Sequence, residues 1–203
     1  PALFLVKYKD KQVGAHLTTP SGINVGRLLN AGAADVKGFE LDAEWAPNDH
    51  WRFGLNYSFL DAKFTDFAFT SNSSNDASRA GDCPRGPSNT LCYFNLKGNR
   101  LERAPRQSVV GQARWSMPVA DMLGAHGLRF FVEGDAQYQG ERFIDIWNRT
   151  KLDSYLIGDV RLGLTSQRWD ALVYVSNVSN NKTVLTGNPF PGDPRNVLRR
   201  VAA

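Results

Sequence analysis

Three carboxylates alternate with apolar residues in the stretch GFELDAEW: Glu40, Asp42 and Glu44. Carboxylates on one face can hold a metal ion or divide the acid and base roles of a catalytic pair. The simpler interpretation is that they are charges on one face of a β-strand, paired across strands with Arg52 or Arg114. The choice depends on the elements that carry them.

The other residues with catalytic or ligating potential are dispersed along the chain. Three histidines fall far apart in predicted loops or turns, where a solvated side chain is the ordinary interpretation: His16, His50 and His126. The sequence has no HExxH, GxSxG, P-loop or GxGxxG motif. We therefore predict that the protein is not an enzyme and has neither a metal site nor a cofactor.

Two cysteines, Cys83 and Cys92, lie in a segment rich in Gly, Pro, Asn and Ser. Neither belongs to a CxxC motif or has a histidine nearby, which argues against zinc. We predict a disulfide that closes a short loop, and such a bond requires an oxidising compartment. Two free loop thiols are the alternative.

The composition suits both a soluble protein and a membrane β-barrel. Of the 203 residues, 42% are hydrophobic, and the mean hydropathy is −0.37. No run of about 18 apolar residues is present, which excludes a transmembrane helix, whereas a transmembrane strand hides its apolar residues by alternation. The net charge of +4 comes from scattered Lys and Arg residues, so we predict no nucleic-acid partner.

The elements that must position the carboxylates are β-strands. In residues 39–45 and again in 51–59, every second residue is apolar and the residues between them are mostly charged or polar. A period of two is the signature of a strand. The turn at Ala46–His50, with its proline and Asx residues, predicts an antiparallel hairpin.

The same alternation recurs in two further hairpins and one more strand: 109–117 with 128–138, 155–165 with 169–175, and 3–14. Phe131 and Val110 break the pattern. No segment has a helical period. We therefore predict an all-β fold, an antiparallel meander of about eight strands.

The connections are short at one end of the strands and long at the other. Trp45 to Trp51 and Thr165 to Trp169 are tight, whereas three long loops are predicted at the opposite end: 14–28, 68–106 and 140–154. A compact soluble domain rarely carries a structureless loop as long as the middle one. Outer-membrane barrels combine short periplasmic turns with long extracellular loops, so the asymmetry favours a barrel.

Aromatic residues gather at two levels of these strands. Trp45, Trp51 and Trp169 lie at the short-turn end, and Tyr57 and Tyr138 lie roughly one membrane thickness away, since a spanning strand needs about 9–11 residues. Two levels of amphipathic rings are typical of the girdles at membrane interfaces. The same rings would also suit the core of a soluble sandwich, but the loop asymmetry favours the membrane.

We therefore predict that the apolar face meets lipid and that the ionic face lines a wide lumen. The predicted lipid-facing and girdle residues are Trp45, Trp51, Phe53, Tyr57, Trp115, Phe130, Tyr138 and Trp169. The predicted lumen-facing charged residues are Glu40, Asp42, Glu44, Arg52, Arg114, Arg129, Glu133 and Asp135.

Three motifs in order resemble the C-terminal barrel of TonB-dependent outer-membrane receptors. Residues 38–41 (GFEL) and 57–62 (YSFLDA) are similar to a Gly-apolar-Glu-apolar strand followed by a Tyr-Ser-Tyr/Phe-Leu-Asp-Ala strand. Gly98–Ser108 is similar to the segment that leads into the next strand, with Glu102 where the family usually has proline. Residues 177–182 resemble a loosened form of the family's Asn-Leu-x-Asp-Lys turn.

The resemblance implies a part of a larger plugged barrel in the bacterial outer membrane, which in full has roughly 22 strands. It implies import of a scarce solute, most commonly a ferric siderophore, with vitamin B12-like cofactors and glycans as further classes. The implied partners are outer-membrane lipid, the TonB complex acting through the plug, and a small-molecule substrate such as an iron chelate.

The chain departs from the family pattern at both ends. It starts without a leader at Pro1, has neither a TonB box nor a plug domain, and ends on DPRNVLRRVAA, without the family's terminal aromatic residue. We therefore interpret residues 1–203 as a partial barrel and expect an open, curved sheet whose first and last strands are unpaired. The alternatives are a self-contained small outer-membrane barrel with a structural or adhesive role, and a soluble β-sandwich binding module.

Overall fold

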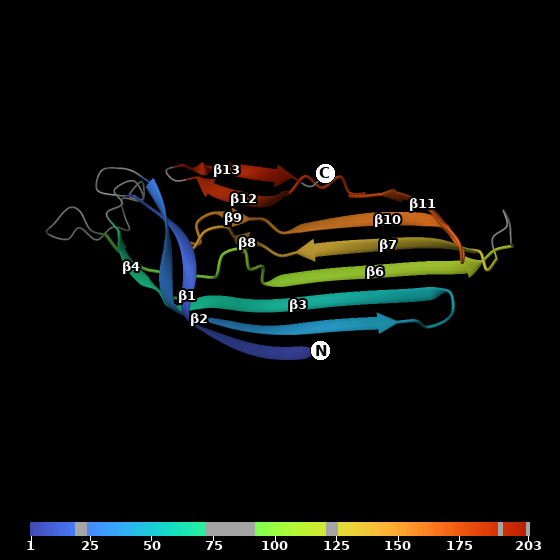
Figure 1. Ribbon diagram of the computed structural model, residues 1–203, viewed down its shortest axis with the longest axis horizontal. Coiled ribbons are helices and arrows are strands. Elements are labelled where there is room, and N and C mark those ends of the chain that lie inside the picture. The colour runs from blue at the N-terminus through green and yellow to red at the C-terminus, as the bar shows by residue number, and fades with distance from the viewer. Residues whose placement is uncertain (19–23, 72–91, 121–125, 191–192, 202–203) are drawn as a thin grey trace.

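The computed structural model describes residues 1–18, 24–71, 92–120, 126–190 and 193–201, and the regular elements in these ranges are β-strands. Seven of them form one antiparallel sheet in the order β1-β2-β3-β6-β7-β10-β11 (Figure 1). Their bounds are β1 Ala2–Thr18, β2 Asn24–Trp45, β3 Trp51–Asp66, β6 Gln107–Pro118, β7 Arg129–Gln139, β10 Tyr155–Thr165 and β11 Asp170–Val175. No helix able to cross a membrane occurs in the described ranges.

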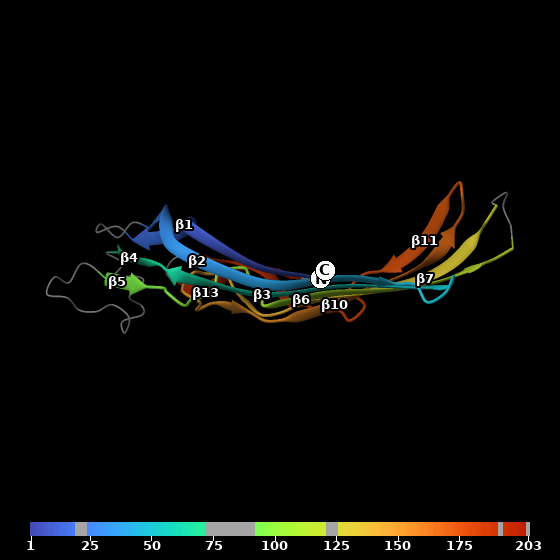
Figure 2. The same ribbon diagram turned by 90° about the horizontal axis from the view of Figure 1, so that it is seen from below.

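The sheet is a single curved layer that stays open (Figure 2). Its two edges are β1 and β11, which are not hydrogen-bonded to each other. The predicted all-β antiparallel meander and the predicted open sheet are confirmed, with seven strands in the main sheet where about eight were expected. A closed small barrel would need these edges to pair, since only closure removes both.

Capping side chains hold the short-turn end of the sheet. The Asn48 Oδ1 atom accepts hydrogen bonds from the backbone N–H groups of His50 and Trp51, both at 3.0 Å. In the turn between β10 and β11, the Ser166 hydroxyl accepts from the Trp169 N–H at 3.0 Å and donates to the Trp169 carbonyl at 2.8 Å. Asn and Ser turns of this kind reverse the chain within a few residues, so both hairpins are tight as predicted.

Two asparagines fasten the turn that follows β11. The Asn177 side chain accepts from the Asn181 N–H at 2.8 Å and donates to the Asn181 carbonyl at 3.0 Å. The Asn181 side-chain amide donates to the Leu156 carbonyl at 2.9 Å, and the Val178 N–H donates to the Gly158 carbonyl at 2.8 Å. The segment that resembles the family's turn is therefore tied to the beginning of β10.

Each predicted long loop contains strand structure. β1 and β2 stay paired up to Thr18 and Asn24, so the loop predicted at 14–28 is wrong at both of its ends. The alternation signal is weak there because small residues interrupt it, among them Gly14, Ala15 and Gly26. Three further two-stranded sheets are β4 (Ala68–Ser71) with β5 (Cys92–Asn95), β8 (Arg142–Phe143) with β9 (Lys151–Leu152), and β12 (Val184–Phe190) with β13 (Asp193–Val201).

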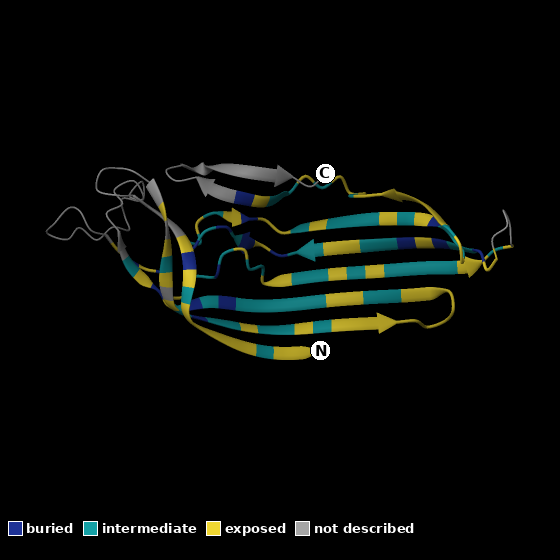
Figure 3. Ribbon diagram, in the orientation of Figure 1, coloured by how far each residue is buried: buried dark blue, intermediate teal, exposed yellow. Residues whose placement is uncertain are grey.

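The hydrophobic core lies at the long-loop end of the sheet, where buried segments gather in Figure 3. Its residues are Val13, Ala34, Ala62, Phe64, Phe67, Leu96, Leu101 and Ile146. The rings of Phe64 and Phe67 pack with their centroids 4.9 Å apart. At the short-turn end the sheet is one layer, and Trp45 is 64% exposed. A soluble sandwich would bury such residues under a second sheet, and no described sheet covers Trp45.

Candidate functional site

Strand pairing sorts the side chains of the main sheet into two faces, because residues directly opposite each other in antiparallel strands share a face. On one face, five successive rows contain no charged residue, and we call them the apolar belt. The rows are Leu41, Tyr57, Val109, Tyr138 and Leu156; Ala43, Leu55, Gly111, Ala136 and Gly158; Trp45, Phe53, Ala113, Gly134, Val160 and Val175; Trp51, Trp115, Val132, Leu162 and Val173; and Met117, Phe130, Leu164 and Ala171.

Seven of the eight residues predicted to face lipid or form girdles belong to the apolar belt, and Trp169 lies in the turn at its short-turn end. The Phe53 ring stacks between Trp45 and Trp51, with centroid distances of 5.3 and 5.4 Å. Tyr57 and Tyr138 share the row at the opposite border. The rings therefore stand at two levels, and their contact with lipid stays a prediction.

The opposite face, which we call the ionic face, carries the eight charged residues predicted to line a lumen. Glu40, Asp42 and Glu44 are opposite Ser58, Asn56 and Gly54 of β3. Four charged residues form a single row across neighbouring strands: Arg52, Arg114, Glu133 and Arg161. Asp135 and Arg129 lie in other rows of the same face. That this face lines a lumen stays a prediction.

Glu133 is the centre of a charge cluster on the ionic face. Its Oε2 atom is 3.0 Å from Arg114 Nη1, and its Oε1 atom is 2.8 Å from Arg161 Nη1. Arg161 Nη2 reaches Asp135 Oδ1 at 2.6 Å. Glu133 is 5% exposed although the sheet is a single layer, since two guanidinium groups cover it. A carboxylate buried to this degree needs such partners.

Phe131 breaks the alternation because it supports this cluster. Its ring is 6% exposed on the ionic face, and the Arg114 guanidinium carbon lies 4.0 Å from the ring centroid. A guanidinium stacked on an aromatic face keeps its edge free for hydrogen bonds. Phe131 thus packs against the Arg114 guanidinium group, which forms an ion pair with Glu133. Val110 also lies on this face, and no contact explains it.

The pairing expected for the three alternating carboxylates is wrong. Among the described residues, Arg114 forms its ion pair with Glu133 of β7, and no ion pair joins Arg52 or Arg114 to Glu40, Asp42 or Glu44. The reason is the strand order, since β6 lies between β3 and β7 and presents Arg114 to Glu133 in direct register. The alternation in the sequence does not contain this information.

The polarity of the two faces reverses at the row of Phe39 and Phe59, towards the long-loop end. On the side of the apolar belt, the next two rows contain charged residues. The first row is Leu5, Lys37 and Asp61, and the second is Lys7, Asp35 and Lys63. On the other side, the rows become apolar and reach the core: Val6, Val36 and Ala62, then Tyr8, Ala34 and Phe64. The belt thus has a sharp charged border at one level.

An ion pair beyond this border, Glu141 with Lys151, shifts the pKa values of both of its members. The Lys151 ammonium donates a 2.7 Å hydrogen bond to Glu141 Oε2. This bond and the attraction between the charges lower the pKa of Glu141 below its ordinary 4.5 and raise the pKa of Lys151 above its ordinary 10.5. Both groups lie in the segments that follow β7, outside the apolar belt.

The cysteines and histidines form no catalytic or metal-binding group among the described residues. Cys83 falls outside the described residues, so its disulfide with Cys92 stays a prediction. His50 makes a 2.8 Å hydrogen bond between its Nδ1 atom and the Ser116 carbonyl, which fixes the short turn. No group of three or more ligand-type side chains forms a metal site among the described residues.

A family model matches most of the chain. The "TonB dependent receptor-like, beta-barrel" model matches residues 2–180. The chain belongs to this family. The recognition made from the three motifs is therefore confirmed, and the family is one of receptors and not of enzymes. No curated protein matches the chain.

Solved structures of similar fold are barrels much longer than this chain. The ferric yersiniabactin uptake receptor FyuA from Yersinia pestis is 20% identical with a TM-score of 0.66, over 98% of this chain and 24% of its own. The siderophore receptor PiuA from Acinetobacter baumannii is 18% identical with a TM-score of 0.57, over 90% of this chain and 22% of its own. The ferric preacinetobactin receptor BauA from the same organism is 15% identical with a TM-score of 0.56, over 95% of this chain and 24% of its own. The chain thus spans about a quarter of each receptor.

Proposed function

We propose that the chain is a section of the wall of a TonB-dependent receptor in the bacterial outer membrane. Its apolar belt faces lipid, and its ionic face lines the lumen. The observation that carries this proposal is the belt itself, five rows without a charge, bounded by the charged rows that begin at Lys37 and Asp61. The free edges of β1 and β11 support a place within a larger wall and argue against the self-contained small barrel.

The neighbouring residues Leu55 and Asn56 allow a direct test of the two faces, because one belongs to the belt and the other to the ionic face. Each is replaced by a spin-labelled cysteine in the full receptor, reconstituted in lipid vesicles, with Cys83 and Cys92 replaced by serine. We expect the label at position 55 to be relaxed by oxygen, which concentrates in hydrocarbon, and the label at 56 by a water-soluble nickel chelate. Equal nickel accessibility at both positions would overturn the assignment.

For the substrate, we propose an iron chelate of the siderophore class, imported with energy from the TonB complex through the plug of the full receptor. The support is the function of the three fold relatives, which are siderophore or ferric-chelate receptors. The test is uptake of radiolabelled ferric siderophores by cells that carry the full receptor, with and without a functional TonB protein. We expect TonB-dependent accumulation of at least one chelate. Uptake of cobalamin or a glycan instead, with no ferric chelate taken up, would contradict the substrate class but leave the placement of the wall intact.

A further inference from the structure

Two segments of the long-loop end belong to separate predicted loops but contact each other. They are residues 92–106 and 141–152, and we call them the first and second end segments. The strands within them, β5, β8 and β9, do not pair between the two segments. One backbone hydrogen bond joins the segments directly, from the Arg103 N–H to the Phe143 carbonyl at 2.7 Å. The other contacts between them come from side chains.

Asn148 of the second end segment makes the main contact with the first. Its Oδ1 atom accepts a hydrogen bond from the Arg100 backbone N–H at 2.6 Å, and its Nδ2 atom donates to the Arg100 carbonyl at 2.8 Å. One side-chain amide thus engages both backbone groups of Arg100, as a residue of a neighbouring antiparallel strand would. The Asn99 side chain adds a third bond, since its Nδ2 atom donates to the Ile146 carbonyl at 2.9 Å.

The local structure around Asn148 fixes the direction of its side chain. Asn148 has a φ of 55°, in the left-handed region, which asparagine adopts more readily than most residues. The Asp145 carboxylate accepts hydrogen bonds from the Thr150 N–H at 2.8 Å and the Arg149 N–H at 3.3 Å. The Asp145 carbonyl accepts from the Asn148 N–H at 3.2 Å. These bonds close a turn that holds Asn148 against Arg100.

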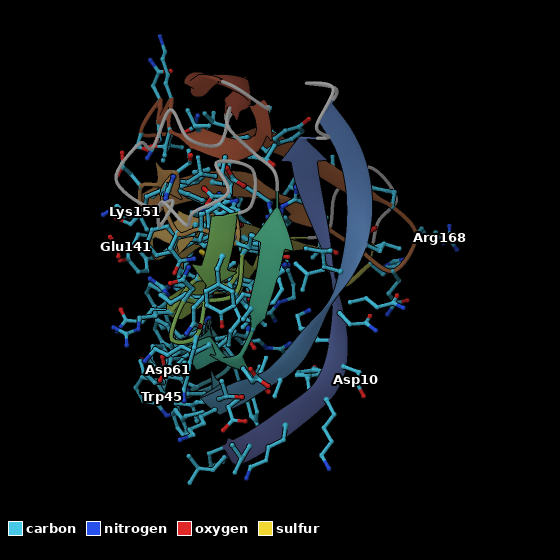
Figure 4. All side chains as sticks on the ribbon, turned by 90° about the vertical axis from the view of Figure 1, so that its left-hand side faces the viewer. Asp10, Trp45, Asp61, Glu141, Lys151 and Arg168 are labelled. Carbon is cyan, nitrogen blue, oxygen red and sulfur yellow. The ribbon has the colours of Figure 1, made fainter. Side chains whose placement is uncertain are left out.

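The base of the second end segment is tied to the same residue of the first. Glu141 and Lys151 lie beside each other in Figure 4, and the Lys151 ammonium donates to Glu141 Oε2 at 2.7 Å. Arg100 Nη1 is 3.6 Å from Glu141 Oε1. Arg100 therefore contacts the second end segment twice, at Asn148 through its backbone and at Glu141 through its side chain.

Apolar packing joins the two end segments as well. Ile146 is 4% exposed and shares the hydrophobic core with Leu96 and Leu101. The Trp147 ring meets Phe94 edge to face, with centroids 4.7 Å apart. Neither segment can leave the sheet without exposing apolar surface of the other.

From these contacts we propose that the two end segments open and close as one body, joined by Asn148. The two hydrogen bonds from Asn148 to Arg100 replace the strand pairing that the segments lack. A disturbance in either segment is therefore transmitted to the other. This coupling does not depend on which face of the sheet meets lipid.

The test is hydrogen exchange of the full receptor, followed by mass spectrometry, which measures the opening of each segment separately. Asn148→Gly removes both side-chain bonds and still permits the left-handed backbone, because glycine adopts a positive φ readily. We expect exchange to become about tenfold faster in residues 98–103 as well as in 145–150. The matched control is Asn95→Ala, which removes a bond inside the first segment, from the Lys97 N–H to Asn95 Oδ1 at 3.0 Å. This control should leave residues 145–150 unchanged.

A second variant, Asp145→Ala, separates transmission from direct contact. The Asp145 carboxylate bonds to Arg149 and Thr150, both in its own segment. Exchange in residues 98–103 should nevertheless become faster, because the turn that positions Asn148 is lost.

Faster exchange confined to residues 145–150 in both variants would overturn the inference. So would equal acceleration of both segments in Asn95→Ala, since the whole end would then loosen whichever bond is removed. If Asn148→Gly fails to fold, the unmodified receptor in mild denaturant still decides. Its two end segments should lose protection at the same denaturant concentration, and loss at different concentrations would contradict a single body.

Discussion

The apolar belt and the long-loop end of the same sheet are built with opposite polarity. In the belt, apolar side chains such as Leu55 are exposed on one face, and the ionic face opposes them. Beyond Phe59, the charges lie on the belt's side, and the apolar side chains turn inward to a core around Phe64. Both regions alternate with a period of two, so the difference reflects the surroundings of each region. A sheet face in contact with water favours charged side chains, whereas a face in contact with lipid disfavours them.

The largest loss of stability is expected in the core of the long-loop end. Phe64→Ala should reduce the stability of this end by about 3–5 kcal/mol, because the 1%-exposed ring leaves a cavity among Phe67 and its neighbours. The belt should remain folded, since none of its rows packs on this core. Limited proteolysis measures the first effect, and the heat-modified gel migration of the full receptor measures the second. Tyr93→Ala, at a residue 54% exposed, is the control.

A charge placed in the belt should have the next largest effect. Leu55→Arg should destabilise the receptor in vesicles by roughly 2–4 kcal/mol, because the guanidinium would lie in hydrocarbon. Asn56→Arg, one residue away on the ionic face, should be mild. Guanidinium-induced unfolding followed by tryptophan fluorescence gives both values. Similar losses at the two positions would contradict the assignment of the two faces, because both faces would then have the same surroundings.

Removing the carboxylate at the centre of the ionic cluster should have a smaller effect. Glu133→Gln leaves Arg114 and Arg161 without their shared partner, but both arginines remain about one-third exposed or more, so we expect a loss of about 1–3 kcal/mol. The same unfolding assay measures it. Additional replacement of Arg114 by methionine should recover part of the loss, whereas Arg161 is kept because it also pairs with Asp135. No recovery would mean that Glu133 acts through contacts other than its ion pair with Arg114.

The smallest expected effect concerns pH and the ion pair between Glu141 and Lys151. Because the pKa of Glu141 is lowered in the folded chain, its ion pair with Lys151 stabilises the loop end at neutral pH, and this stabilisation is lost as the pH falls below 4.5 through the folded value. The raised pKa of Lys151 gives the opposite limit, with loss as the pH rises above 10.5. Protease protection of residues 140–154 should show both limits, and Glu141→Gln should remove the acid one. An unchanged acid limit in that variant would assign it to other carboxylates.

Much of the architecture could be predicted because strand alternation is local. The hairpin around Asn48, the two levels of aromatic rings and the opposite faces of Leu55 and Asn56 all follow from period two and turn chemistry. The three family motifs further predicted that the chain is part of a larger barrel. The pairing of β1 and β2 up to Thr18 and Asn24 was missed, because small residues interrupt the alternation signal there.

Within each strand, the alternation in the sequence is enough to assign side chains to a face, because a strand alternates whatever its neighbours are. Which charges meet depends on the folded sheet, because Arg114 and Glu133 become partners through the register of β6 with β7 and not through their spacing in the chain. The same holds for Asp61 and Glu141, which pair with Arg106 and Arg100 from segments far away in the sequence. Pairing energies depend on distances of a few ångströms, and only the folded sheet sets those distances.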